Sequence, residues 1–99
     1  MARIGLAIGG ALDTKDLLDV VKTAEMEGYE SFWLTEGGGK DSISQLSVLA
    51  CSTSTIRLGT GIITIYSRTP SLMAMTAASL DEISGGRFVL GLGTGHKSG

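Results

Sequence analysis

Two side chains in this 99-residue sequence have the chemistry to transfer a proton or hold a ligand, Glu36 and His96. Glu36 lies in a glycine-rich stretch directly after an apolar segment, where a carboxylate could bind or protonate a ligand. A solvated loop charge is the alternative interpretation. His96 is the single histidine and could exchange a proton near neutral pH, although surface histidines without a catalytic role are the more common case.

A third candidate is Arg68, which directly precedes Thr69-Pro70. A cation there would stand against the dipole of the helix that this pair predicts, because helix N-termini favour anions. An anionic ligand would account for such an arginine. Cys51 is interpreted as a small packed residue. One cysteine and one histidine exclude a disulfide framework and a cysteine-based zinc site, so we expect no metal centre.

Two glycine motifs invite a nucleotide-binding interpretation, and both fail on inspection. In the segment 91–95, the last glycine of a dinucleotide fingerprint would have to stand where His96 or Ser98 is found. The fingerprint must also open a helix after the first strand of a βαβ unit. Gly39-Lys40 is followed by Asp41 in place of the Ser or Thr of a phosphate-binding loop.

Composition excludes several classes of protein. Hydrophobic residues make up 42% and charged residues 18%, which excludes a disordered chain and is typical of one packed domain, here residues 1–99. A formal net charge of -2 without a cluster of Lys or Arg argues against nucleic-acid binding. No apolar run is long enough to span a membrane, and the first residues do not resemble a signal peptide. We therefore expect a soluble, cytoplasmic protein.

The candidate residues must be positioned by alternating strands and helices. Helices are predicted from the N-cap candidates Asp13 or Thr14, Asp41 or Ser42, and Thr69, with Pro70 at the first helical position. Gly28 and Gly85-Gly86 are predicted to end the first and third helices. Trp33 is expected in the core. Apolar runs bounded by glycines predict strands over residues 4–8, 29–35, 56–62 and 88–92.

The resulting order β-α-β-α-β-α-β predicts an α/β fold with parallel strands and right-handed crossovers. All strands then end at the same side of the sheet, where parallel α/β proteins bind their ligands. The segments to examine are therefore 9–10, 35–40, 60–68 and 93–97.

Several motifs give the sequence a more specific relationship. The segments Gly59–Ile62, Tyr66–Pro70, Ala74–Phe88 and Leu90–Gly95 closely resemble the bacterial luciferase-like superfamily. The nearest branch is similar to the deazaflavin (coenzyme F420)-dependent oxidoreductases related to methylenetetrahydromethanopterin reductase. This resemblance implies a TIM (β/α)8 barrel and hydride transfer between coenzyme F420 or a flavin and an organic substrate. An FMN-dependent monooxygenase is a variant of this hypothesis, and a catalytically inactive half-barrel fragment or assembly unit is the alternative.

The resemblance also implies which residues form the site. Glu36 stands where relatives often carry an acidic residue followed by histidine, and here glycine follows it. A cis peptide bond is implied between Gly61 and Ile62. The catalytic candidates are Glu36 and His96, and the expected contacts of F420 or FMN are Thr35, Thr60, Gly61, Ile62, Ser67, Thr94 and Gly95.

The length of the chain departs from that family. A (β/α)8 barrel needs about 250 residues, whereas four strands make half a barrel. A half-barrel leaves two open sheet edges and an uncovered apolar face, which favour association. Either the chain is a truncation or copies assemble. A two-fold axis could place the fourth strand of one chain beside the first strand of the other, so a homo-oligomer of two half-barrels is predicted.

Overall fold

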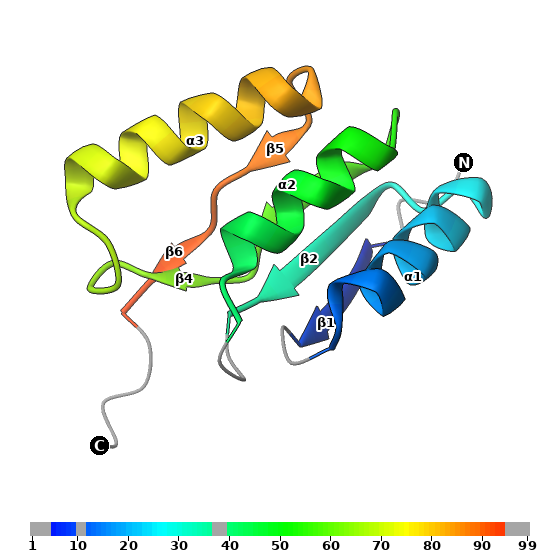
Figure 1. Ribbon diagram of the computed structural model, residues 1–99, viewed down its shortest axis with the longest axis horizontal. Coiled ribbons are helices and arrows are strands. Elements are labelled where there is room, and N and C mark those ends of the chain that lie inside the picture. The colour runs from blue at the N-terminus through cyan, green and yellow to red at the C-terminus, as the bar shows by residue number, and fades with distance from the viewer. Residues whose placement is uncertain (1–4, 10–11, 37–39, 95–99) are drawn as a thin grey trace.

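The computed structural model describes residues 5–9, 12–36 and 40–94 (Figure 1). The order of elements confirms the predicted alternation, with one difference: the third and fourth predicted strands are each split in two. The elements are β1 (Gly5–Gly9), α1 (Thr14–Met26), β2 (Ser31–Thr35), α2 (Ser42–Ser52), β3 (Arg57–Thr60), β4 (Ile63–Thr64), α3 (Pro70–Ser84), β5 (Phe88–Val89) and β6 (Leu92–Gly93).

The strands are parallel, as predicted. Four of them form one sheet in the order β1-β2-β3-β5, in which Trp33 of β2 lies between Ala7 and Gly59. The strands β4 and β6 form a separate two-stranded sheet, in which Ile63 lies opposite Leu92. The break between β3 and β4 falls at Gly61-Ile62, whose peptide bond is cis, as the resemblance implied. All strands of the main sheet therefore end on one side.

Capping residues fix the helix ends where the sequence predicted them. The Asp41 side chain accepts from the Ser44 N–H at the start of α2, at 3.0 Å. Thr69 caps α3 through the Leu72 N–H at 3.2 Å. Gly85 ends α3 with a φ of 67°, a left-handed conformation that glycine adopts without a steric penalty. The second helix therefore starts directly beside the end of β2, where Glu36 lies.

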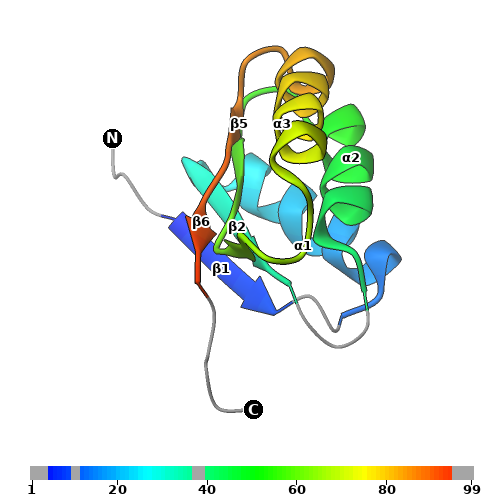
Figure 2. The same ribbon diagram turned by 90° about the vertical axis from the view of Figure 1, so that its left-hand side faces the viewer.

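The three helices cover one face of the sheet (Figure 2). Phe32 and Leu34 of β2 point to this face and are fully buried, because alternate residues of a strand face opposite sides. Cys51 is exposed on α2, so its interpretation as a packed residue was wrong. The core between sheet and helices consists of Leu17, Val21, Ala24, Phe32, Leu34, Leu46, Leu49, Ala50, Ile56, Leu58 and Leu80.

Trp33 lies on the opposite face, which corrects its expected place in the core. It stands between the buried Phe32 and Leu34 and is only half-buried. Its Nε1 donates to the Ser31 Oγ at 3.0 Å, and its ring covers Gly59, where a Cβ atom would lie 2.4 Å from the Trp33 Cζ3. No helix among the described residues covers this face. The fluorescence of the single tryptophan is therefore sensitive to what binds there.

Glu25 anchors the end of α1 to the segment that precedes β3. One of its carboxylate oxygens accepts from the N–H groups of Thr55, Ser54 and Ile56 at 2.7, 2.8 and 3.1 Å. Burial alone would raise the pKa of Glu25, but these hydrogen bonds outweigh it and lower the pKa to about 2. The carboxylate therefore stays ionised, and its contacts intact, well into the acid range.

Arg87 makes a second anchor at the same end of the sheet. Its Nε donates to the Ser84 carbonyl at 2.6 Å, and Nη1 donates to the Thr53 hydroxyl and the Ile56 carbonyl, both at 2.9 Å. Its Nη2 donates to the carbonyls of Ala50 and Thr53 at 3.0 and 3.1 Å. A cation at the C-terminus of α2 is also favoured by the helix dipole. Arg87 therefore joins α2, α3 and the start of β3.

Candidate functional site

The predicted site residues gather where the strands end. Thr35 is the last residue of β2 and lies opposite Gly9 of β1. Thr60 ends β3, and the Gly61 N–H donates to the Leu34 carbonyl at 2.9 Å. Main-chain hydrogen bonds likewise hold β4 against β6. The structure thus brings the ends of β1, β2, β3 and β6 to one rim.

Glu36, the first catalytic candidate, is fully engaged by its neighbours. Its Oε1 accepts from the Arg68 Nη1 at 3.1 Å and its Oε2 from the Arg68 Nη2 at 2.8 Å. The same Oε2 accepts from the N–H and the hydroxyl of Ser42, each at 3.1 Å. A carboxylate held this way serves as an anchor at the rim.

The sequence missed the partner of Arg68. An anionic ligand was one explanation for this arginine, but the structure supplies the anions from the chain itself, Glu36 and Asp41. The two carboxylates lie beside the start of α2, and Arg68 approaches them from the turn before α3. The positive charge of Arg68, which is unfavourable near a helix N-terminus, is therefore balanced by these two carboxylates. No local spacing could reveal this, because Glu36 and Arg68 are 32 positions apart.

The pKa values of this cluster follow from its contacts. The hydrogen bond from Arg68 is the main reason that the pKa of Glu36 is lowered. Burial would raise the pKa of Asp41, but hydrogen bonds from Ser44 and the charge of Arg68 outweigh it, so its pKa is also lowered. The hydrogen bond to Glu36 raises the pKa of Arg68. All three groups are charged at neutral pH.

Thr60 is buried and joins two strands by its hydroxyl group. The Gly91 N–H donates to the Thr60 Oγ1 at 2.7 Å, and the same hydroxyl donates to the Gly91 carbonyl at 2.9 Å. The side chain is 1% exposed. Its hydroxyl is therefore used inside the protein, which leaves the side chain of Thr60 no free group for a cofactor.

The other predicted contact residues are more accessible. Ile62 is exposed and lies across Gly93. Ser67 is exposed and donates to the Thr64 carbonyl at 2.9 Å. Thr94 is exposed just after β6, and Thr35 and Gly61 are partly exposed. Gly95 and His96 lie outside the described residues, so the second catalytic candidate is not placed.

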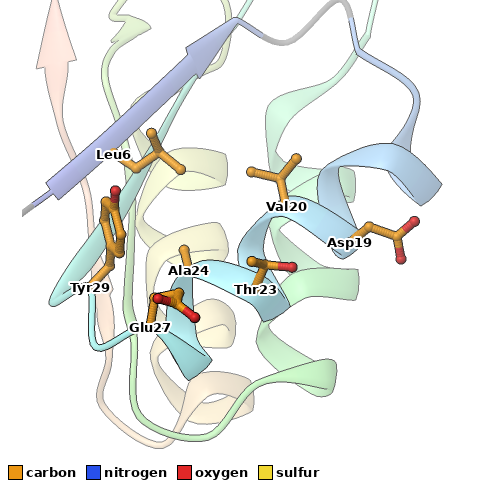
Figure 3. Close-up of a pocket in the computed structure, with 7 residues that line it drawn as sticks. All are labelled: Leu6, Asp19, Val20, Thr23, Ala24, Glu27 and Tyr29. Carbon is orange, nitrogen blue, oxygen red and sulfur yellow. The ribbon is translucent and has the colours of Figure 1, made fainter.

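Hollows in the described part of the chain lie beside the rim and elsewhere on the surface. A small one of about 130 Å³ lies beside the rim and is lined by Ile65, Arg68, Pro70, Met73 and Leu92. A larger one of about 390 Å³ lies between α1 and the edge of β1 (Figure 3). It is lined by Leu6, Asp19, Val20, Thr23, Ala24, Glu27 and Tyr29, which lie toward the amino ends of the strands. The hollow beside the rim shares Arg68 with the candidate site, whereas the lining of the hollow between α1 and β1 includes none of the site residues.

Two further properties, metal binding and membrane crossing, concern residues 5–9, 12–36 and 40–94. Among them, His, Cys, Asp and Glu side chains form no group of three or more that could hold a metal ion. No helix in the described part of the chain is long and apolar enough to cross a membrane.

Comparisons with known proteins agree with this architecture. A curated 5,10-methylenetetrahydromethanopterin reductase from Methanolobus tindarius is 44% identical over 78 residues, which cover 78% of this chain and 24% of the relative. The solved structure of the coenzyme F420-dependent tetrahydromethanopterin reductase from Methanopyrus kandleri superposes with a TM-score of 0.91 at 33% identity. This superposition covers 97% of this chain and 28% of that one.

A more distant structure shares the fold. The oxygenating component of 3,6-diketocamphane monooxygenase from Pseudomonas putida, solved in complex with FMN, superposes with a TM-score of 0.87 at 17% identity. The match covers 97% of this chain and 30% of that one. The chain thus spans roughly a quarter to a third of the length of these proteins, and its strands and helices match part of their TIM-barrel-like fold.

The family itself is established by the extent of the match. The family model described as luciferase-like monooxygenase matches residues 1–98, which is nearly the whole sequence. The match includes both the segments that carried the resemblance and the rim described above. The chain therefore belongs to the luciferase-like monooxygenase family.

Proposed function

We propose that this chain forms part of the cofactor site of an oxidoreductase that transfers a hydride between coenzyme F420 or a flavin and a small organic substrate. The observation that carries the proposal is the absence of side chains at Gly9, which ends β1, and at Gly61, which follows β3. A Cβ atom on Gly9 would meet only the Thr35 Oγ1 at 3.7 Å, and one on Gly61 only the Trp33 Cβ at 3.5 Å. This open surface suits a planar ring.

The relatives support the type of cofactor. The structurally similar reductase is F420-dependent, and the more distant monooxygenase binds FMN. When bound, either group would supply the redox chemistry, and the protein would position it against the substrate. FMN-dependent oxygenation is the second candidate function, favoured by the fold shared with that monooxygenase.

We assign the residues as follows. Thr35, Gly61 and Ile62 would contact the ring, and Thr60 would hold the strand ends beneath it. Ser67 and Thr94 would lie at the edge of the site, and Gly95 keeps its proposed role as a contact of the cofactor. His96 keeps its proposed role in proton transfer. Glu36 enters the proposal as a positioning residue, because its carboxylate is bound to Arg68 and Ser42.

The single tryptophan provides the test of this function. Trp33 lies on the same face as Thr35, so a flavin or deazaflavin bound at the strand ends should quench its fluorescence. We expect saturable quenching on titration with FMN or F420. Gly61→Val should weaken binding at least tenfold, because its branched side chain would occupy the surface that receives the ring.

The control for this titration is Ala78→Val, which adds two of the same three carbon atoms at an exposed position of α3. It should bind like the parent chain, and both variants should keep a cooperative thermal transition. No quenching of the parent chain by either cofactor would contradict the proposed function and favour an inactive half-barrel.

A second proposal concerns the assembly of the chain. We infer that copies associate, because β1 and β5 are the outer strands of the sheet and the face carrying Trp33 is uncovered among the described residues. Two half-barrels could pair edge to edge. Light scattering at micromolar concentration should give a dimer or a larger species, and a stable monomer of 10.2 kDa would contradict the inference.

The free cysteine supports the cytoplasm as the proposed location.

A further inference from the structure

Three charged side chains connect two loops at the rim. Glu36 follows β2, Asp41 begins α2, and Arg68 ends the turn that leads into α3. The Arg68 guanidinium binds both carboxylates, and its side chain is only 13% exposed. The Glu36 side chain is 21% exposed. A paired arrangement of Arg with a carboxylate is among the strongest and most directional contacts in proteins.

The pair acts on both loops through further hydrogen bonds. On one side, Glu36 binds the N–H and hydroxyl of Ser42 and so fixes the first turn of α2. On the other side, the Arg68 Nη1 donates to the Ser67 Oγ at 3.1 Å, and the Ser67 hydroxyl donates to the Thr64 carbonyl. The contacts therefore run without interruption from α2 to β4.

The connected segments are those that flank the proposed ring surface. Thr35 directly precedes Glu36, and Ile62 directly precedes β4. None of the three charged residues belongs to the hydrophobic core, so the fold does not depend on them for its buried apolar area. A change in the pair should alter the spacing of the two loops and leave the sheet intact.

We propose that the Glu36–Arg68 pair is a clamp that sets the distance between the β2–α2 and β4–α3 loops and thereby shapes the rim that receives the ring. Glu36 is then a positioning residue that acts through Arg68. The inference rests on the proposed function for its link to the cofactor, whereas the clamp itself can be measured on the free protein.

The test uses hydrogen exchange and ring binding on the same variants. Glu36→Leu and Arg68→Met remove the pair from either side. In both, the amide of Ser67, which donates to the Thr64 carbonyl at 3.2 Å, should exchange at least tenfold faster, whereas the Gly61 amide, bound to Leu34, should exchange as in the parent chain. Affinity for FMN or F420, measured by Trp33 quenching, should fall at least tenfold.

Two further variants make the test specific. Lys40→Met removes a neighbouring cation whose partner, Asp13, is 77% exposed, and it should change neither measurement. The double variant of Glu36 and Arg68 should lose less than the sum of the two single variants, because both single variants remove the contact between these two side chains. Glu36→Gln keeps the shape of the side chain and should restore part of the protection of Ser67.

The outcomes separate the clamp from the proposed function. Unchanged exchange at Ser67, or losses that add in the double variant, would overturn the clamp. Faster exchange with unaltered affinity for a ring that the parent chain binds would also overturn it. If the parent chain binds neither ring, the proposed function fails, and the exchange data decide on the clamp by the same criteria.

Discussion

Replacing Arg87 with methionine should lower the free energy of unfolding by roughly 3 kcal/mol, because hydrogen bonds from a charged donor are worth about 1.5 to 3 kcal/mol each and their acceptors lose their partner. Four of the five acceptors are main-chain carbonyls of residues in or beside α2, α3 and β3. For a domain of this size, such a loss lowers the thermal midpoint by roughly 12 to 24 °C. Circular dichroism during heating and urea titration would measure both values.

A lysine at this position should rescue little of the stability. Its ammonium group cannot reproduce the planar fork that reaches α2 and β3 together. Arg57→Met is the matched control, since Arg57 is exposed at the start of β3, and it should change the unfolding free energy by less than about 0.5 kcal/mol. Equal effects at the two arginines would show that the hydrogen bonds of Arg87 contribute no special stability.

Replacing Gly91 with alanine should also cost roughly 3 kcal/mol, because the new Cβ would collide with the main chain. That atom would lie 2.2 Å from the Thr60 carbonyl oxygen, which cannot move without displacing β3. The collision would also separate the Gly91 main chain from the Thr60 hydroxyl. Urea denaturation should show a lower midpoint, provided the variant folds at all.

Gly9→Ala is the control for this experiment. Its Cβ would approach only the Thr35 Oγ1 at 3.7 Å, which is an ordinary contact. Stability should stay the same or increase slightly, because alanine loses less conformational freedom than glycine on folding. A Gly91→Ala variant as stable as Gly9→Ala would contradict the close approach of Gly91 to the Thr60 carbonyl.

Most of the fold could be predicted from the sequence because its signals are local. Asp41, Thr69 and Gly85 mark helix ends through contacts within a few residues, and apolar runs mark the strands. The face of Trp33 could not be predicted this way. A run such as Phe32-Trp33-Leu34 is apolar on both sides, so its pattern does not tell which residues meet the helices.

The candidate site was only partly predictable, and for a different reason. The rim followed from the parallel topology, and the resemblance pointed to the cis peptide at Gly61-Ile62. The contacts of Glu36 with Arg68 and of Thr60 with Gly91 join residues more than 30 positions apart. Such pairs depend on the three-dimensional path of the chain, so the sequence left Glu36 as a candidate acid and the resemblance made Thr60 a cofactor contact.

The anchors formed by Glu25 and Arg87 have a consequence for how this protein can diversify. Both lie at the amino ends of the strands, whereas Thr35, Ile62 and Thr94 lie at the opposite ends. Substitutions at the proposed site can therefore accumulate at one end without weakening the contacts that hold the helices at the other. In directed evolution, libraries confined to the loops after β2 and β4 should retain a larger share of folded members than libraries at residues 53–56 or 84–87.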